Sequence, residues 1–297
     1  MKTLNPTLRA ANAADRQAVF EICRQIWPET DHLPDYWLRF MSDRSTLARV
    51  IEVGGQVAAV SFLDLKEGSA WWHSVRVAPA FQRLGLATRF LNHFIEESRR
   101  HGVGRLRFAA GRNSESMQSL ADRKGFRLLS RHRYVCAGPL SESEENPLSV
   151  GPLKVSDLDR VAGFLHSSVS WRAGHRTACS LWVWDDLTRD SLRSMLEAGT
   201  VYGSFEGDRI EGIALTNQDR DLDYNWLFLS RIDGSARSIE KLGRLLRRLV
   251  SSLKSDCGEE CPVQGMVLDD PAIIEGLFRA GYRFFSGEDM DLFELIL

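Results

Sequence analysis

The fold of this chain is decided by one stretch, which reads Val75-Arg76-Val77-Ala78-Pro79-Ala80-Phe81-Gln82-Arg83-Leu84-Gly85-Leu86-Ala87-Thr88-Arg89-Phe90-Leu91. In it a short apolar strand runs into a small loop and then directly into an amphipathic helix. Gly85 and the small Ala87 let the backbone approach a ligand closely. A helix that begins near Leu86 points its unpaired N–H groups and the positive end of its dipole toward an anion. The stretch therefore predicts a phosphate site at a strand–loop–helix junction.

The loop differs from two familiar phosphate-binding patterns. A P-loop would end in Gly-Lys-Ser/Thr, and the dinucleotide fingerprint would need three spaced glycines. The loop between Ala78 and Thr88 has neither pattern. From the loop alone, a plain strand–turn–helix with a capped helix start stays open as the alternative.

The composition limits the classes of partner. The chain has 297 residues, with 38 basic and 40 acidic side chains and a formal net charge of −2. This length suits one large domain or two of ordinary size, and the charge balance lacks the basic excess that nucleic-acid binding needs. No apolar run approaches the ~20 residues of a membrane span, and Met1–Ala14 lacks a targeting pattern. We therefore expect a soluble cytoplasmic protein with neither nucleic acid nor membrane as partner. The sequence does not indicate an oligomeric state.

The cysteines predict free thiols. There are five, an odd number, and they are scattered along the chain. Without a secretion signal, this usage favours reduced thiols. Cys257 and Cys261 flank a short polar segment, but a metal site would need two further ligands nearby. We therefore expect two loop thiols and no metal.

Both halves of the chain show the same order of signals, which suggests duplication. Each half opens with a strand and a capped helix start, at residues 8–15 and 151–157. Paired strands with a tight turn follow, at residues 48–65 and 200–216. Each half then gives an apolar strand, a long helix, another strand and a short helix.

The short helix of each half ends in a Gly-aromatic step, at Gly125-Phe126 and at Gly281-Tyr282. Between the halves, residues 140–150 are polar and contain a proline, which is typical of a linker. We therefore predict an N-terminal domain over residues 1–139 and a C-terminal domain over residues 151–297.

The order V-x-V-x-P-x-x-Q-R-x-G-x-A-T from Val75 to Thr88 resembles the acyl-CoA pyrophosphate loop of the GCN5-related N-acetyltransferase (GNAT) family. As an order of elements the resemblance covers nearly the whole chain, while its specific motifs lie in the N-terminal half. It implies an α/β (α+β) fold, namely a tandem GNAT arrangement with two copies of a mixed central sheet flanked by helices. It also implies acetyl-CoA as co-substrate.

The resemblance implies an acetyl-CoA site on the strand, the loop and a later turn. In the family, free backbone groups of the strand pair with the pantetheine arm, and loop amides hold the pyrophosphate. The residues implied here are Val75, Arg76, Val77, Gln82, Arg83, Leu84, Gly85, Leu86, Ala87, Thr88 and Asn113. As alternatives, Arg83 is only a solvated loop charge and Asn113 only a helix cap.

Amine acetylation needs a base that takes a proton from the attacking ammonium and a donor that steadies the oxyanion. His73 is the predicted base, because histidine titrates near neutral pH and the two-residue strand period places it on the same face as Val75. A backbone N–H near Val75 is the predicted oxyanion donor. Glu52 and Asp64, on neighbouring strands, are the reserve bases. The alternative is that His73 is a structural strand residue.

One family feature is missing. Many members have a tyrosine just before the Gly-Phe step, which protonates the departing sulfur, and here that position is Ala121. A thiol with a pKa of about 8.5 can leave as thiolate. Tyr134 or a water is the predicted substitute. The alternative is a domain that binds acetyl-CoA without turning it over.

The segment from Trp27 to Trp37 is rich in aromatic and acidic groups, and we predict that it binds the acceptor amine. The expected acceptor-binding residues are Asp31, Asp35, Tyr36, Trp37 and Arg39. Arg39 is preferred over Arg76 for gripping a carboxylate, because regular alternation turns Arg76 away from His73. The D-x-L-P-D-x-W stretch resembles the histidine N-acetyltransferase branch of the family. A surface helix–loop with aromatic core anchors is the alternative.

We predict that the second copy is degenerate. Its strand Trp226–Leu229 leads into Ser230–Arg237, which lacks the spaced small residues and carries Asp233 where an anion would lie. A carboxylate at that place repels pyrophosphate.

The sequence thus predicts an enzyme that transfers an acetyl group from acetyl-CoA to the amine of a small molecule, for which a free amino acid such as histidine is a plausible acceptor. Only the N-terminal copy would be active. Two alternatives remain: acetylation of a protein or peptide amine, and a non-catalytic acetyl-CoA-binding sensor or scaffold.

Overall fold

The computed structural model describes residues 5–28, 30–140, 149–180, 182–217, 227–251, 261–285 and 289–297. Most of the expected linker, Cys257 and Trp226 lie outside the described residues. The fold is mixed α/β, as expected. Among the described residues, no helix has the length and apolar character to cross a membrane.

The chain forms two compact units, and each is interrupted in sequence. The first contains Met1–Phe108, Ser119–Arg127 and Phe293–Leu297, and the second contains Ala109–Gln118 and Leu128–Leu292. The units therefore do not follow a single cut between residues 139 and 151. Among the last five residues, Phe293 and Glu294 are buried against Phe108 and Arg107 of the first unit.

In the first unit, five strands lie side by side in sequence order, and the last residues of β15 (Met290–Ile296) lie next to β5. The five strands are β1 (Thr7–Ala10), β2 (Thr46–Val53), β3 (Gln56–Lys66), β4 (Ser69–Val77) and β5 (Arg105–Gly111). The first four pair antiparallel, while β4 and β5 are parallel. Gly54 and Gly55, both with positive φ, make the tight turn between β2 and β3.

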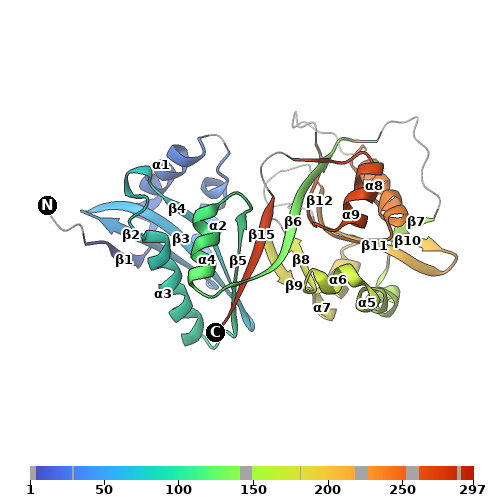
Figure 1. The fold of residues 1–297 in the computed structure, drawn as a ribbon, viewed down its shortest axis with the longest axis horizontal. Helices are drawn as coiled ribbons and strands as arrows, with labels where there is room; N and C mark the ends of the chain where they lie inside the picture. Colours follow the sequence, from blue (N-terminus) through green and yellow to red (C-terminus); the bar gives the residue numbers. More distant parts are fainter. Residues whose placement is uncertain are drawn as a thin grey trace. The chain divides into compact units, whose positions relative to one another are not determined.

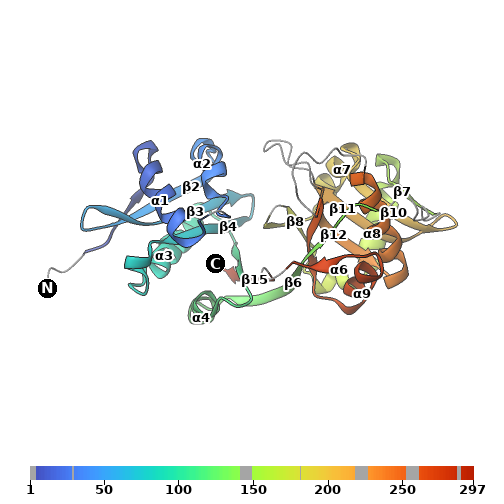
Figure 2. The ribbon, with the colours of Figure 1, turned by 90° about the horizontal axis from the view of Figure 1, so that it is seen from above.

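Helices cover both faces of this sheet (Figures 1 and 2). They are α1 (Arg16–Ile26), α2 (Leu33–Ser42), α3 (Leu86–Arg100) and the part of α4 (Glu115–Arg123) from Ser119 onward. Figure 2 shows α1 and α2 on one side of β2–β4 and α3 on the other. The apolar faces of α1 and α2 bury Val19 and Trp37 against Val60 and Phe62 of β3. His73, the candidate base on β4, contacts the ring of Phe62 in this core.

The second unit repeats this order with one insertion. Its main sheet runs β6-β13-β12-β11-β10-β7, with β14 paired to β6, and β8 and β9 form a separate hairpin. The strands are β6 (Arg127–Ala137), β7 (Val150–Pro152), β8 (Thr177–Ser180), β9 (Val183–Asp186), β10 (Val201–Glu206), β11 (Arg209–Asn217), β12 (Leu227–Gly234), β13 (Val263–Leu268), β14 (Arg283–Phe284) and β15 (Met290–Ile296), whose last residues join the first unit.

The helices of the second unit form two groups. They are α5 (Leu158–Ser167), α6 (Val169–Ala173), α7 (Arg189–Glu197), α8 (Ala236–Ser251) and α9 (Pro271–Arg279). Helices α8 and α9 share one core with β12 and β13, whereas α5, α6 and α7 share another with β10 and β11. Figure 1 shows the two groups apart, with β10 and β11 between them.

The predicted duplication of elements is confirmed. Both halves run strand, helices, hairpin, strand, long helix, strand, short helix and strand, and the second adds α6 and the β8–β9 hairpin. Both short helices end at a glycine with positive φ, Gly125 and Gly281. The next amide, of Phe126 or Tyr282, bonds back to the carbonyl five residues earlier. This helix termination explains the Gly-aromatic step.

A buried ion pair ties the end of the chain to the first unit. Arg107 Nε on β5 donates to Glu294 Oε2 on β15 over 2.8 Å, and both side chains are at most 5% exposed. The neighbouring Phe108 and Phe293 stack with their ring centroids 5.2 Å apart. Burial alone would raise the pKa of Glu294, but hydrogen bonds from Arg127 and Arg107 hold it below its ordinary value. Glu294 is therefore a buried carboxylate that remains charged.

Replacing Glu294 with leucine is expected to destabilise the protein by about 3–5 kcal/mol, because it leaves the Arg107 guanidinium buried without its partner. Chemical denaturation of the full chain measures this change. The double variant Arg107→Met with Glu294→Leu should recover most of the loss, because both charges then leave the interior together. A single variant as stable as the wild type would contradict the structural role of the pair.

Candidate functional site

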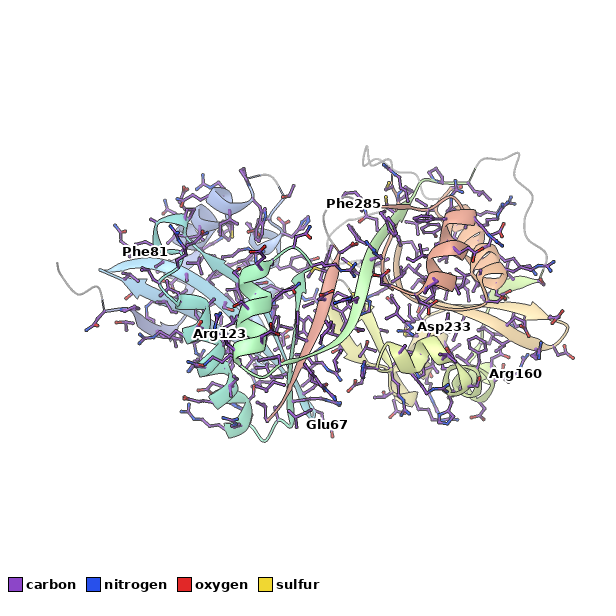
Figure 3. All side chains as sticks on the ribbon, in the orientation of Figure 1. Glu67, Phe81, Arg123, Arg160, Asp233 and Phe285 are labelled. Atoms are coloured by element: carbon purple, nitrogen blue, oxygen red, sulfur yellow. The ribbon has the colours of Figure 1, made fainter. Side chains whose placement is uncertain are left out.

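The predicted phosphate loop has an open helix start. Strand β4 ends at Val77, a short 3-10 turn covers Pro79–Phe81, and α3 begins at Leu86. Phe81, at the end of the 3-10 turn, is labelled in Figure 3. Gly85 is the N-cap of α3 with φ of 75°, and no side chain caps this helix. The first amides of an uncapped helix have no partner within the helix, so they are free to bind an anion.

The space beside Gly85 fits such a ligand. A Cβ built on Gly85 meets no heavy atom within 4 Å, so the backbone is open to the outside. Arg83 also has a positive φ, of 63°. Gln82, Arg83 and Leu84 are exposed, and the Gln82 side chain donates back to the Val77 carbonyl over 3.3 Å. The exposed loop thus precedes a helix N-terminus that no side chain caps.

Strand β4 parts from β5 before it reaches this loop. The register of the parallel pair consists of Ala70 with Leu106 and Trp71 with Arg107, and it ends there. The backbone of β4 beyond Trp71 is therefore not part of that ladder. An extended ligand can pair with such a strand edge.

A β-bulge in β4 changes the face on which its side chains lie. His73 pairs with Phe62 and Arg76 pairs with Val60, so two residues of β4, Ser74 and Val75, stand opposite one residue of β3. Ser74 has φ of 52°, which is unusual for a residue other than glycine. Cross-strand partners share a face, and the side chains of a strand alternate between faces. His73 and Arg76 therefore lie on the same face, and the prediction that Arg76 points away from His73 is wrong. The prediction that His73 and Val75 share a face assumed regular alternation, which the bulge interrupts between these two residues.

His73 lies between a carboxylate and a hydroxyl. Its Nε2 is 3.2 Å from Asp64 Oδ1 on β3, and its Nδ1 is 3.0 Å from Ser74 Oγ. Nε2 is buried and lacks an aligned hydrogen bond, so its contact with Asp64 is that of a close charge neighbour. The ring packs edge-on against Phe40 of α2, with centroids 4.9 Å apart.

Asp64 is held in its charged form. Burial alone would raise its pKa, but the contact with His73, the Thr46 hydroxyl at 2.7 Å and the charge of Lys66 together keep the pKa below its ordinary value. Asp64, expected as a reserve base, is thus placed as the partner of His73. The site therefore contains a histidine with an adjacent charged carboxylate, which is an arrangement suited to accepting a proton.

Glu52, the other reserve base, has a structural environment. Its Oε1 accepts from Arg9 over 2.6 Å, and Arg9 also pairs with the buried Asp15 at 2.7 Å. Asp15 in turn accepts from the Asn12 amide at the start of α1. Glu52 belongs to this network, which joins β1, β2 and the beginning of α1.

The residues expected near the departing sulfur, Ala121 and its predicted substitute Tyr134, are both buried. Ala121 is fully buried in α4 and has no proton to give. Tyr134 lies in the second unit, where it is buried and its hydroxyl donates to Gln264. Asn113 lies in the turn before α4, and Gln118 N donates to Ser114 O over 3.0 Å. This bond makes Ser114 the N-cap of α4, one residue after the predicted cap.

Asp31, expected to hold the acceptor cation, is paired inside the protein. Arg76 Nε and Nη2 donate to its two carboxylate oxygens over 2.7 and 2.9 Å, and its side chain is only 2% exposed. The Arg76 guanidinium also lies 4.4 Å from the ring centroid of Trp27. The pair fastens the connection between α1 and α2 to strand β4. A bidentate, buried carboxylate is committed to this role, so the expectation for Asp31 is corrected.

The other expected acceptor residues are divided between core and surface. Trp37 is 1% exposed and packs edge-on against Phe20 and Phe62, so it is a core anchor. Tyr36 stacks on Phe40, the ring that contacts His73. The remaining two, Asp35 and Arg39, are exposed on α2. The alternative interpretation, aromatic core anchors on a helix–loop, is thus correct for Trp37.

The second unit differs at the equivalent helix start. Ser235 precedes α8, and its Oγ accepts from the Ser238 amide over 3.2 Å. A Cβ on Gly234 would meet the Glu211 carbonyl oxygen at 2.7 Å, so β11 packs tightly there. Asp233, labelled in Figure 3, is buried and accepts from Ser168, Ser170 and Arg231. Asp233 therefore does not project toward an anion site. A side-chain cap and close packing occupy this helix start instead.

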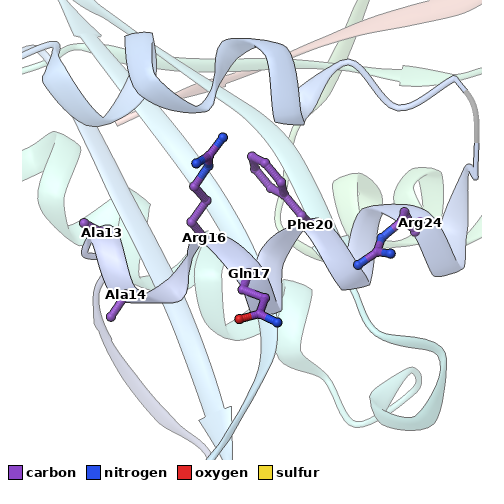
Figure 4. Close-up of a pocket in the computed structure, with 6 residues that line it drawn as sticks. All are labelled: Ala13, Ala14, Arg16, Gln17, Phe20 and Arg24. Carbon is purple, nitrogen blue, oxygen red and sulfur yellow. The ribbon is translucent and has the colours of Figure 1, made fainter.

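A separate surface hollow of about 440 Å³ lies along α1. In Figure 4 the side chains of Arg16 and Phe20 extend side by side from one side of this helix. The Arg16 guanidinium is 4.9 Å from the Phe20 ring centroid. The hollow is lined by Ala13, Ala14, Arg16, Gln17, Phe20 and Arg24. It contains no residue of β4 or of the loop before α3.

Sequence reasoning missed two residues of the site, Ser74 and Phe40. A bulge has no reliable sequence signal, because a serine in an apolar strand fits a regular strand equally well. Phe40 follows Tyr36 at a spacing of four, so helix periodicity could have placed the two side by side.

Comparison with known protein families gives a match within the N-terminal half of the chain. A family model described as the Acetyltransferase (GNAT) family matches residues 16–126. No curated protein matches the sequence.

Solved structures match nearly the whole chain. A GCN5-related N-acetyltransferase from Sphaerobacter thermophilus is 15% identical with a TM-score of 0.69, over 99% of this chain and 97% of that one. A tandem GNAT protein from the clavulanic acid biosynthesis pathway is 14% identical with a TM-score of 0.61, over 99% and 98%. A glucosamine N-acetyltransferase region of a fungal multi-domain β-N-acetylglucosaminidase is 12% identical with a TM-score of 0.65, over 99% of this chain and 38% of that chain. At such identities the likeness shows the fold, which is the expected tandem arrangement.

Replacing Asp31 with asparagine is expected to lower the free energy of unfolding by about 3 kcal/mol at pH 7, because Arg76 loses its buried partner. Burial alone would raise the pKa of Asp31, but Arg76 holds it below its ordinary value of 3.8. The pair therefore contributes its stability above about pH 3.8, and this contribution is lost as the pH falls through the lower folded-state pKa.

Urea unfolding of wild type and variant, repeated from pH 7 downward, checks this expectation. Asp35→Asn is the matched control, since Asp35 is exposed in the first turn of α2, four residues after Asp31, and its loss should change the stability by less than about 0.5 kcal/mol. Equal stability of Asp31→Asn and wild type at pH 7 would show that the pair does not fasten the connection.

Proposed function

We propose that the protein is a GNAT-type acyltransferase that transfers an acetyl group from acetyl-CoA to the amine of a small molecule. The GNAT family model that matches residues 16–126 supports this proposal. The observation that carries this proposal is the uncapped start of α3 at Gly85, directly after β4. An open helix N-terminus with positive φ at its cap suits a pyrophosphate. The family assignment and the local geometry thus support the same co-substrate.

The co-substrate supplies an activated acetyl group, and this chain supplies its binding surface. We propose that the pyrophosphate binds the amides of Arg83, Gly85 and Ala87 and that the pantetheine arm pairs with β4 between Val75 and Val77. The early end of the β4–β5 ladder supports the second part, because the arm needs a strand edge that is not already paired. Binding through backbone amides makes side-chain identity in the loop secondary.

His73 is the proposed general base. Its ring lies on β4 just before the strand segment assigned to pantetheine, and Asp64 Oδ1 lies 3.2 Å from its Nε2. A backbone N–H near Val75, within the bulge, is the proposed oxyanion donor. The departing sulfur leaves as thiolate in this scheme, because Ala121 offers no acid and a thiolate is a fair leaving group.

We propose that the acceptor binds beside α2. Tyr36 lies one ring away from His73 through Phe40, and Asp35 and Arg39 are exposed on the same helix. An acidic, an aromatic and a basic side chain together suit a zwitterionic amine such as a free amino acid, histidine included. Thiol release over a panel of free amino acids, histamine and short peptides distinguishes the candidates. Turnover on peptides alone would favour a peptide N-acetyltransferase, and binding without any turnover would favour a sensor.

The second copy is proposed as a structural domain without a nucleotide site. Ser235 and the close packing at Gly234 occupy the place where α8 would otherwise bind an anion. One acetyl-CoA per chain is therefore expected.

Replacing Gly85 with glutamate is expected to abolish acetyl-CoA binding, because it places bulk and negative charge where the backbone meets the pyrophosphate. Calorimetry measures affinity and stoichiometry, with one site per wild-type chain. Gly55→Glu is the matched control: Gly55 also has a positive φ, of 84°, and open space around its Cβ, but it lies in the β2–β3 turn. Equal affinity of Gly85→Glu and Gly55→Glu would refute the loop assignment, and two bound equivalents would refute the degenerate second copy.

Replacing His73 with alanine is expected to lower turnover by about 10²–10⁴-fold near neutral pH, with little change in acetyl-CoA affinity, as when a general base is lost. Thiol release across pH measures this, and the inflection on the acidic side of the wild-type profile should disappear. His101→Ala, at the exposed end of α3, is the control and should retain full activity. Full activity of His73→Ala would make His73 a structural residue.

A further inference from the structure

The bulge in β4 places the hydroxyl of Ser74 next to His73, the proposed general base. Ser74 has φ of 52°, and its Oγ lies 3.0 Å from Nδ1 of His73. Nothing in a regular strand would bring adjacent side chains together in this way, because they would point to opposite faces. Strained backbone of this kind is retained where the surrounding structure fixes it, and it is concentrated at functional sites.

Asp64 determines which ring nitrogen of His73 can accept a proton. The carboxylate lies 3.2 Å from Nε2, and a charged carboxylate favours a proton on the nitrogen beside it. Nε2 is also buried, so no solvent or substrate reaches it. With the proton on Nε2, the lone pair of the neutral ring lies on Nδ1, where the Ser74 hydroxyl can donate to it.

We propose that Ser74 relays the proton of the acceptor amine to His73. The inference rests on the proposed acetyl transfer and adds a catalytic residue to it. The Ser74 hydroxyl is in contact with Nδ1 of His73. If this contact is kept when the amine binds, the proton of the amine reaches His73 through the Ser74 oxygen.

The relay balances as follows. The acceptor binds as an ammonium and passes one proton to Ser74 Oγ, while the hydroxyl proton of Ser74 moves to His73 Nδ1. The freed nitrogen lone pair forms the C–N bond to the acetyl carbon, and the C–S bond breaks with its electron pair on sulfur. The second proton of the nitrogen neutralises that sulfur. The products are the amide, the free thiol of coenzyme A and an imidazolium beside Asp64, which returns its proton to solvent through Ser74.

The charges around His73 are compatible with this transfer. Strand β3 presents Asp64, with Lys66 next along the same face, and β4 itself presents Arg76, which is paired with Asp31. Helix α2 presents the uncharged Phe40, backed by Tyr36. Among the described residues, Asp64 is the charged group that lies beside the ring, with its Oδ1 3.2 Å from Nε2, so it is the counter-ion for the imidazolium.

The test removes the Ser74 hydroxyl without straining the bulge. Glycine adopts positive φ freely, so Ser74→Gly should fold at least as well as the wild type. We expect kcat to fall about 10- to 100-fold, within the range for lost proton-transfer catalysis, with an acetyl-CoA affinity within about twofold of the wild type. Ser74→Cys, which keeps a proton that can be relayed, should recover most of the rate. Ser69→Ala, on the same strand but in the regular ladder with Lys66, is the control.

A double-variant cycle with His73→Ala distinguishes a relay from a structural role. If Ser74 acts only through His73, then Ser74→Gly costs nothing further once His73 is alanine. Independent, multiplicative losses, or full activity of Ser74→Gly, would overturn the relay while leaving acetyl transfer intact. Acetylated Ser74 in the mass spectrum of the enzyme would also overturn it, in favour of an acyl-serine. A wild type without turnover on any amine would instead overturn the proposed function, and the relay with it.

Discussion

The bulge at Ser74 and Val75 is the constraint on which the candidate site depends. It inserts one residue into β4 opposite a single residue of β3, and so it shifts the alternation of every later side chain in the strand. His73 and Arg76 consequently lie on the face covered by α1 and α2. Without the bulge, the Arg76 side chain would lie on the α3 face and could not hold the connection between α1 and α2. The inserted residue therefore brings Arg76 to the face of His73, where it holds the connection between α1 and α2 through Asp31.

The two copies show how one fold can keep or lose an anion site. In both copies a strand, β4 or β12, is followed by a long helix, α3 or α8. Gly85 precedes α3, and Ser235 precedes α8. In the first copy the cap is Gly85, which has no side chain and open space around it. In the second copy Ser235 caps the helix and Gly234 packs against β11. Helix amides that are satisfied internally have no need of a ligand, which is the physical reason for expecting one nucleotide per chain.

Buried charge in this protein is mostly part of the framework. The pairs Arg76–Asp31, Arg107–Glu294 and Arg231–Asp233 all have at least one partner that is almost fully buried. The first two pairs join segments that are far apart in sequence, whereas Arg231 and Asp233 both lie on β12. Charges of this kind resemble ligand-binding groups when only the sequence is known, because both kinds are isolated charges among apolar residues. The candidate general base, His73 beside Asp64, differs from these pairs. Its Nδ1 contacts the hydroxyl of Ser74, a residue with a positive φ.

The sequence by itself determined the elements and the phosphate loop. Hydrophobic periodicity, Gly turns and the Gly-aromatic steps are local signals, so the strand–loop–helix at Val75–Leu91 and the repeated order of elements could be predicted from neighbouring residues. Only the tertiary structure decided the roles of Asp31, Trp37 and Ser74. Asp31 is paired with a residue 45 positions away, Trp37 is covered by β3, and Ser74 takes its place from a register shift between two strands. Such pairings depend on which segments meet in space, and a strand reads the same in sequence with or without a bulge.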